Sequence, residues 1–296
     1  MGNKHRFDHS MFMVNPGTSV NLSSIDPAWT HGIESKEKAQ EALLDDVKTL
    51  TAAQEVLWAA GQQAVLIIFQ AMDAAGKDST IKHVMSGVNP QGCVVHSFKA
   101  PSEEEKQHHF LWRPARYLPG KGQIAIFNRS YYEEVLVVKV HPSFLKGQWL
   151  PPQSDGQDLD WLWQRRYDEI RRWEQALAEQ GITIIKFFLH VSKKEQKERF
   201  LKRLDTPEKN FKFSAADVSE RAYWDDYQTS YQQMLSATST AHAPWYVVPA
   251  DKKWFTRAVV ADVITARIEA LDLKIPQLTL QQLNELREAK QKLERE

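Results

Sequence analysis

The chain has 296 residues, of which 38 are basic and 38 are acidic, so its formal net charge is zero. This balance excludes a global charge that would favour nucleic acid, and any polyanion site has to come from local clustering. The single cysteine, Cys93, excludes an internal disulfide framework and indicates a reducing compartment. No apolar run approaches the ~18 residues of a membrane span, and the first residues lack the apolar stretch of a secretory signal. We therefore expect a soluble cytoplasmic α/β protein with no membrane partner.

The chain begins with a polar, irregular stretch, residues 1–33, which we expect to lie as an arm over the surface or over a partner subunit. The apolar pattern that follows predicts helices at residues 35–60, 78–86, 102–118, 161–179, 192–204, 214–235 and 255–271, and again after Pro276. Strands are predicted at residues 64–69, 94–98, 123–128, 182–190 and 244–249. Ser102 with Glu105, and Ser214 with Asp217, resemble capping boxes that mark helix starts.

Strands that alternate with helices and are continuously apolar predict one parallel sheet covered on both faces. Ligands of such sheets bind at the carboxyl ends of the strands. The chain just after Phe69, Phe127 and Leu189 is therefore the expected position of the site.

The stretch from Ala64 to Thr80, AVLIIFQAMDAAGKDST, has the layout of a phosphate-binding loop: a buried strand, a loop of small residues, Gly-Lys and a helix start. Loop N–H groups approach a phosphate closely, the helix N-terminus adds its positive dipole end, and the lysine adds a charge. The match to G-x-x-x-x-G-K-[ST] is imperfect, because Ala71 replaces the first glycine and Asp78 follows the lysine. The expected phosphate-binding residues are Ala74, Ala75, Gly76, Lys77, Asp78 and Ser79. The alternative is a chance Gly-Lys at the start of a helix.

Asp73 lies inside this loop, where a carboxylate would repel phosphate unless it holds Mg²⁺; the alternative is a turn-forming aspartate. Arg129 follows the third predicted strand, where phosphate-binding-loop proteins place their second motif, and its planar guanidinium suits a phosphate clamp. The alternative for Arg129 is a surface Arg–Glu pair.

Arg199 and Arg203 share one face of a basic helix that could close as a lid over phosphates. The alternative for this helix is a solvated surface of mixed charge.

Taken together, these segments resemble the polyphosphate kinase 2 family. The matching stretches run in order from Ala64 to Arg257 and include MDAAGKDSTIKHVMSGVNPQG, SFKAPS, FLWR, IFNRSYYEEVLVVKVHP, IIKFFLHVSKKEQKERFLKRL and TSTAHAPWYVVPADKKWFTR. The resemblance implies an α/β, three-layer P-loop kinase-like fold with about five parallel strands, helices on both faces and a basic helical lid. It also implies reversible transfer of the terminal phosphoryl group of inorganic polyphosphate to AMP or ADP, with Mg²⁺, or alternatively Mn²⁺, as cofactor.

The resemblance assigns roles to individual residues. Asp73 is similar to the carboxylate that organises magnesium and phosphates, Lys77 to the lysine between donor and acceptor, and Arg129 to the arginine after the second motif. Further phosphate contacts are expected at Arg113, Arg199, Arg203 and Lys212. The acceptor nucleotide is expected near Asn89, Asn128, Arg129, Tyr132 and Glu133. Many members have Asp-Arg-Ser-Trp-Tyr-Asn-Arg where this chain has residues 128–134, and the version here resembles the branch that accepts AMP and carries it through ADP to ATP.

The partners implied by the resemblance are polyphosphate and adenine nucleotides, with guanine nucleotides as an alternative, and further copies of the chain in a dimer or tetramer. We expect an N-terminal arm and helix at 1–61, a catalytic domain at 62–272 with a lid at about 193–225, and a charged helical tail at 273–296. The residues alone leave two other functions open: an ATP-dependent nucleoside monophosphate kinase, and a non-catalytic regulator that binds polyphosphate or nucleotide. The zero net charge disfavours a nucleic-acid partner.

Overall fold

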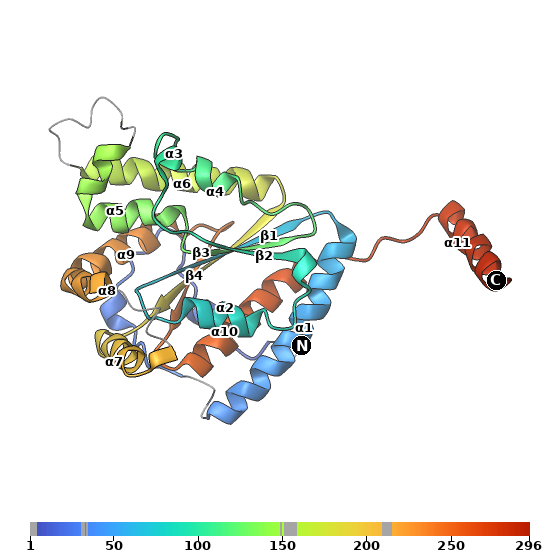
Figure 1. Cartoon of the computed structure of the whole chain (residues 1–296), viewed down its shortest axis with the longest axis horizontal. Helices are drawn as coiled ribbons and strands as arrows, with labels where there is room; N and C mark the ends of the chain where they lie inside the picture. Colours follow the sequence, from blue (N-terminus) through green and yellow to red (C-terminus); the bar gives the residue numbers. More distant parts are fainter. Residues whose placement is uncertain (1–4, 31–32, 34, 149, 151–158, 209–214) are drawn as a thin grey trace.

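The computed structural model describes residues 5–30, 33, 35–148, 150, 159–208 and 215–296, and its centre is a sheet of five parallel strands (Figure 1). The strands are β1 (Ala64–Ala71), β2 (Cys93–Ser97), β3 (Ile124–Asn128), β4 (Ile182–His190) and β5 (Trp245–Pro249). Their order across the sheet is β2-β3-β1-β4-β5, and β1 pairs in parallel with both β3 and β4. The predicted α/β fold with a parallel sheet is confirmed, and each strand boundary lies within two residues of the prediction.

All eight residues of β1 are buried, because helices cover both faces of the sheet. One face carries α1 (Lys36–Ala60), α2 (Lys77–Val84) and α10 (Lys253–Glu269), as Figure 1 shows. The other face carries α5 (Val137–Val140), α6 (Asp160–Glu179) and α9 (Trp224–Thr238). β2 and β3 lie on one side of β1, and β4 and β5 lie on the other, so the order of the strands switches sides at β1. The carboxyl ends of the strands at such a switch point form the expected ligand-binding edge.

The N-terminal arm contributes to the core. It contains the short 3-10 helices η1 (His9–Met11) and η2 (Leu22–Ser24) and forms an antiparallel bridge between Met13 and Tyr246. The N–H of Val14 donates to the carbonyl of Trp245, and the N–H of Val247 donates to the carbonyl of Phe12, both at 2.8 Å. The arm therefore satisfies backbone groups along the edge strand β5. Its side chains Phe7, Phe12 and Val14 are buried against the body. The division of the chain into arm, catalytic domain and tail stays a prediction.

Two carboxylates lie where the arm meets α1 and α10: Asp262 is buried and Asp46 is half-buried. Asp262 accepts hydrogen bonds from the Phe7 N–H at 3.1 Å and interacts with Nε2 of His9 at 2.8 Å. Burial, helped by the nearby charge of Asp262, raises the pKa of Asp46 to about 7 from an ordinary value of 3.8. No described residue forms a hydrogen bond with Oδ2 of Asp46. Asp46 is therefore a carboxylate that folding makes harder to ionise.

We expect Asp46→Asn to stabilise the protein at pH 8 and to leave its stability unchanged near pH 4. The folded carboxyl binds its proton more tightly than the unfolded one, so wild-type stability falls as the pH rises from about 4 to 7. An asparagine has no proton to lose, so this loss of stability does not occur. We expect the free energy of unfolding at pH 8 to rise by about 1–2 kcal/mol, a figure reduced for the partial solvent exposure of the side chain. Urea unfolding at both pH values measures the difference, with Glu41→Gln, the same carboxylate-to-amide change at an exposed position of α1, as the control. A gain of equal size at pH 4 would contradict this account of Asp46.

The helix predicted at 102–118 is wrong in its extent. The structure has two short helices instead, α3 (Glu103–Lys106) and α4 (Trp112–Ala115). The capping box of Ser102 and Glu105 is confirmed at the start of α3. Pro114 lies in the first turn of α4, where a residue without an N–H loses no intrahelical hydrogen bond. In the interior of one continuous helix from 102 to 118 the same proline would be destabilising.

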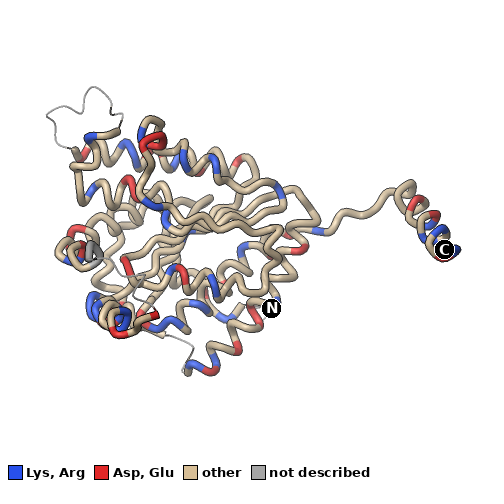
Figure 2. Tube along the Cα trace, viewed as in Figure 1, with Lys and Arg blue, Asp and Glu red and all other residues tan. Residues whose placement is uncertain are grey.

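The helix predicted at 214–235 is also divided, into α8 (Ala215–Glu220), η8 (Arg221–Tyr223) and α9. The capping box predicted at Ser214 lies outside the described residues. The basic helix predicted at 192–204 is confirmed as α7 (Lys193–Leu204), and Figure 2 shows Lys and Arg gathered on it. The tail contains α11 (Leu280–Leu293), which extends away from the body (Figure 1). Among the described residues, no helix combines the length and the apolar character needed to cross a bilayer.

The remaining short 3-10 segments connect the larger elements. They are η3 (Pro90–Gly92), η4 (Tyr131–Val135) and η5 (Pro142–Gly147). Of these, η4 matters most for function, because it follows β3 directly and so begins at the ligand-binding edge of the sheet.

Candidate active site

The loop between β1 and α2 has the geometry of a phosphate-binding loop. Ala74 and Gly76 have φ angles of 60° and 108°, so the chain turns sharply between the strand and the helix. A side chain at φ 108° would be strained, which accounts for the glycine. The N–H of Thr80 donates to the carbonyl of Gly76 at 2.9 Å and Oγ of Ser79 donates to the same carbonyl at 3.0 Å, so α2 begins at once. The first N–H groups of α2 therefore lie at the end of β1, where an anion is favoured.

Lys77 folds back under this loop. Its Nζ donates to the carbonyl of Ala71 at 2.9 Å and to that of Met72 at 3.5 Å, and the residue is 8 % exposed. Burial lowers the pKa of Lys77, the charge of Arg129 lowers it further, and Asp73 opposes both effects. The structure therefore holds a desolvated ammonium group at the point where the sequence predicts the phosphates.

Arg129 connects the loop to η4. Its Nη2 donates to Oδ1 of Asp73 at 2.6 Å, and its Nη1 donates to Oε2 of Glu133 at 3.4 Å. Its own N–H donates to the carbonyl of Phe69 at 3.0 Å, which continues the pairing of β3 with β1. The charge of Glu133, and then that of Asp73, raises the pKa of Arg129, whereas burial raises the pKa of Glu133 against the opposing charge of Arg129. Three predicted residues from two segments, Asp73 in the loop and Arg129 with Glu133 after β3, thus meet in one charged cluster.

Asn128 faces the start of α2. Its Nδ2 donates to Oδ1 of Asp78 at 2.6 Å and to Oγ of Ser97 at 3.4 Å. An amide suits this position because a carboxylate there would face Asp78 as a like charge. The structure thus brings Asn128 to the loop through a hydrogen bond that an aspartate could form only when protonated.

Arg199 of α7 braces the phosphate-binding loop. Its Nη1 donates to the carbonyls of Ala74 and Ala75 at 3.0 and 2.7 Å. Its Nη2 donates to the carbonyls of Ala250 and Asp251 at 2.7 and 3.1 Å, and Nε pairs with Glu195 at 2.8 Å. All five N–H donors of the guanidinium are therefore used within the protein, and Arg199 fixes the loop backbone in this conformation.

The other predicted lid residues lie further along the chain. Arg203, one turn beyond Arg199, places its guanidinium 5.5 Å from the ring centre of Phe200. Lys212 lies outside the described residues. Their expected contacts with phosphate remain predictions.

A cavity of about 460 Å³ opens beside this cluster, and both Arg129 and Glu133 line it. Arg113 lines it too, donating to the carbonyl of Lys99 at 2.7 Å and stacking 4.9 Å over the ring of Phe98. The cavity thus offers cationic guanidinium groups beside an aromatic wall, a combination that suits a ligand with both a phosphate and a planar ring.

Two residues expected near the nucleotide are placed elsewhere. Asn89 caps η3 at the beginning of β2, at the end of the sheet opposite the loop, and its N–H donates to Oε1 of Gln54 at 3.3 Å. The prediction that Asn89 lies near the acceptor is thereby corrected, because a parallel strand separates it from the site. The side chain of Tyr132 points into the core with no exposed surface, so the expected direct contact between Tyr132 and a nucleotide is corrected as well.

The sequence analysis missed two residues that support the site. Gln196 donates to the carbonyl of Asp73 at 2.9 Å, and Gln70 donates to Oγ of Ser130 at 3.0 Å. The sequence contains a pattern that could have indicated each of them. Gln196 stands three residues before Arg199 on the same face of α7, and Gln70 is a polar residue within an otherwise apolar buried strand.

Comparison with known proteins identifies the family of this chain. The family model described as polyphosphate kinase 2 (PPK2) matches residues 33–276. The chain belongs to the polyphosphate kinase 2 family. It is 50 % identical over 287 residues to an ADP-polyphosphate phosphotransferase of Rhodopseudomonas palustris, covering 95 % of this chain and 97 % of the relative. It is 44 % identical over 267 residues to an AMP/ADP-polyphosphate phosphotransferase of Meiothermus ruber, covering 90 % and 95 % of the two chains.

A solved structure shows the same fold. The crystal structure of polyphosphate kinase 2 from Arthrobacter aurescens TC1 superposes with a TM-score of 0.85 at 37 % identity, covering 96 % of this chain and 98 % of that one. The resemblance and the P-loop kinase-like fold predicted from the sequence are both confirmed.

Proposed function

We propose that this PPK2-family protein transfers the terminal phosphoryl group of inorganic polyphosphate to AMP or ADP, and catalyses the reverse reaction. The observation that carries the proposal is the meeting of Lys77, Asp73 and Arg129 at the carboxyl ends of β1 and β3. Relatives at 50 % and 44 % identity bear the names ADP-polyphosphate and AMP/ADP-polyphosphate phosphotransferase, which supports the same assignment.

In this proposal the residues act by position and charge. A transferring phosphoryl group needs alignment and neutralisation of its oxygens more than covalent help. Lys77 and the first N–H groups of α2 would bind the phosphates at the loop, and Arg129 would bind them from the β3 side. The acceptor is already an anionic phosphate oxygen, so the reaction requires no strong general base.

We further propose Mg²⁺, or alternatively Mn²⁺, as the cofactor, with Asp73 as its protein ligand. No group of three or more described His, Cys, Asp or Glu side chains is arranged to hold a metal. Magnesium in phosphoryl-transfer sites takes one or two carboxylates together with substrate phosphates and water, so Asp73 in the loop fits this requirement. When bound, the metal supplies charge neutralisation at the phosphate oxygens.

The acceptor would occupy the cavity beside Arg129. Its volume of about 460 Å³ lies within the range of small-ligand sites, and Arg113 and Phe98 line its wall. We propose AMP and ADP as the acceptors, with guanine nucleotides as an alternative.

The test is to mix the protein with Mg²⁺, long-chain polyphosphate and either AMP or ADP, and to separate the nucleotides by chromatography. We expect ADP and then ATP to form from AMP. ATP formed from ADP alone would keep the phosphotransferase and discard AMP as an acceptor. Guanosine nucleotides in parallel reactions measure the selectivity for the base.

We also propose a homo-oligomer, a dimer or a tetramer, in the cytoplasm. α11 extends from the body and leaves Leu280, Leu286 and Leu293 exposed, which favours contact with another copy. Light scattering coupled to size-exclusion chromatography measures the mass of the assembly, and a monomer at micromolar concentration would contradict the oligomer.

A further inference from the structure

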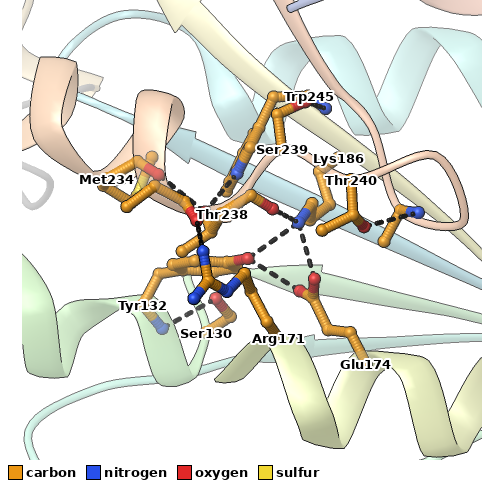
Figure 3. Close-up of polar contacts among 12 residues, drawn as sticks. Ser130, Tyr132, Arg171, Glu174, Lys186, Met234, Thr238, Ser239, Thr240 and Trp245 are labelled. Carbon is orange, nitrogen blue, oxygen red and sulfur yellow. Dashed lines mark hydrogen bonds and ion pairs between the residues drawn. The ribbon is translucent and has the colours of Figure 1, made fainter. Parts of the chain in front are cut away.

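A fully buried ionic cluster lies beneath η4. The side chains of Glu174 on α6 and Lys186 on β4 have no exposed surface, and their Oε2 and Nζ atoms are 2.6 Å apart. Oε1 of Glu174 accepts from the hydroxyl groups of Tyr131 and Tyr132 at 2.6 and 2.7 Å. Nζ of Lys186 also donates to the Tyr132 hydroxyl and to the Thr238 carbonyl, both at 2.8 Å. Figure 3 shows Tyr132, Glu174, Lys186 and Thr238 converging from separate elements.

Every donor of this cluster is used. Lys186 has three N–H donors and three acceptors, and the Tyr132 hydroxyl both accepts from Lys186 and donates to Glu174. Burial raises the pKa of Tyr131 and of Tyr132 well above the ordinary range, so both hydroxyl groups keep their protons. A satisfied network of this kind holds its members in one arrangement.

Stability alone is a poor reason for such a cluster. Removing two charges from water costs free energy that a buried ion pair often fails to recover, and apolar replacements of similar size are frequently neutral or stabilising. The contacts of the cluster show which elements it connects. Two of its members belong to η4, and the other three join η4 to α6, β4 and α9.

η4 carries Glu133 and follows Arg129 closely in the chain. Arg129 lies two residues before Tyr131 and has a φ of 63°, an uncommon angle for a residue with a side chain. Glu133, the partner of Arg129, directly follows Tyr132 on η4. A shift of η4 would therefore move both ends of this charge pair relative to the loop.

We propose that Tyr132, Glu174 and Lys186 are positioning residues, which hold η4 so that Arg129 and Glu133 face the phosphate-binding loop. The inference rests on the proposed function, because it acts through Arg129. It also gives Tyr132 a role that fits its buried position: Tyr132 supports the site from beneath.

A double-mutant cycle between Tyr132→Phe and Arg129→Lys tests the inference. Tyr132→Phe removes only the hydroxyl, and we expect it to lower kcat about ten-fold, because small misplacements of catalytic groups have large effects on rate. The KM for polyphosphate should stay within about two-fold, since Lys77 and the loop are untouched. In the Arg129→Lys background the same change should lower kcat less than about two-fold further, because a displaced Arg129 cannot be lost twice.

Two variants accompany the cycle. Glu174→Gln changes the same cluster from α6 and should show the same coupling to Arg129. If circular dichroism shows that Tyr132→Phe does not fold, Glu174→Gln replaces it in the cycle. Asp262→Asn is the control, since it makes the same carboxylate-to-amide change at a residue that is 1 % exposed and makes its contacts with the arm. It should leave kcat unchanged.

The outcomes separate the two proposals. If Arg129→Lys lowers kcat but the effects of the two changes multiply, the positioning role is overturned and the proposed function stands. If Arg129→Lys keeps full activity, both the role of Arg129 and the positioning inference are overturned. A ten-fold loss in the wild-type background that disappears with Arg129→Lys supports the inference.

Discussion

Replacing Lys77 with alanine is expected to lower kcat about a thousand-fold and to leave the fold intact. The Lys77 ammonium group is buried beneath the loop, where it donates to the backbone carbonyls of Ala71 and Met72. In such a desolvated site a positive charge stabilises the transferring phosphoryl group far more than it would in water. The fold should survive because the change removes a charge that is costly to bury, while alanine favours the start of α2.

Steady-state rates of ATP formation from ADP and polyphosphate measure this effect, with circular dichroism as the check on folding. Lys82→Ala is the matched control, because Lys82 is an exposed lysine on the same helix. Substantial turnover by a folded Lys77→Ala protein would remove Lys77 from the proposed mechanism.

Replacing Arg129 with alanine is expected to lower kcat about a hundred-fold or more. Arg129 is the cation that joins Asp73 of the loop to Glu133 of η4. Without it, two carboxylates would face the incoming phosphates, so the change both removes a clamp and adds repulsion. The free energy of unfolding should change little, since the Arg129 side chain is 38 % exposed and such pairs contribute little to stability.

The measurement is again kcat with each substrate saturating, together with thermal unfolding. Arg171→Ala serves as the control, because Arg171 is also paired with an aspartate, Asp168, but lies on α6 away from the loop. If both arginine variants lost activity equally, a general effect of charge would explain the result better than a phosphate clamp.

The sequence predicts the sheet and the loop well, because their signals are local. Continuous apolar runs mark the buried strands, and Gly76 with Lys77 marks the turn into α2. Once the strands are known to be parallel, their carboxyl ends place Arg129 beside the loop. Asn89 was misplaced because it was assigned from the resemblance alone; it precedes β2, so the same rule for parallel strands would place it at the amino end of the sheet, away from the site.

The contacts that depend on distant segments could not be predicted. Arg199 reaches the loop carbonyls across more than 120 residues of sequence and also bonds to the segment after β5. Spacing along α7 shows which residues share a face, but it does not show what that face meets. In the same way, the two adjacent tyrosines after Ser130 gave no sign that a Glu–Lys pair from α6 and β4 would bind them in the core.

The central claim is that polyphosphate donates the phosphoryl group, and a comparison of donors tests it most directly. The protein would be incubated with Mg²⁺ and AMP, with either polyphosphate or ATP as the only donor, and phosphorus NMR would follow donor and nucleotide together. We predict that with polyphosphate each phosphoryl group gained by the nucleotide matches one lost from the chain. No transfer from polyphosphate, combined with ADP formation from ATP and AMP, would contradict the account and identify a nucleoside monophosphate kinase instead.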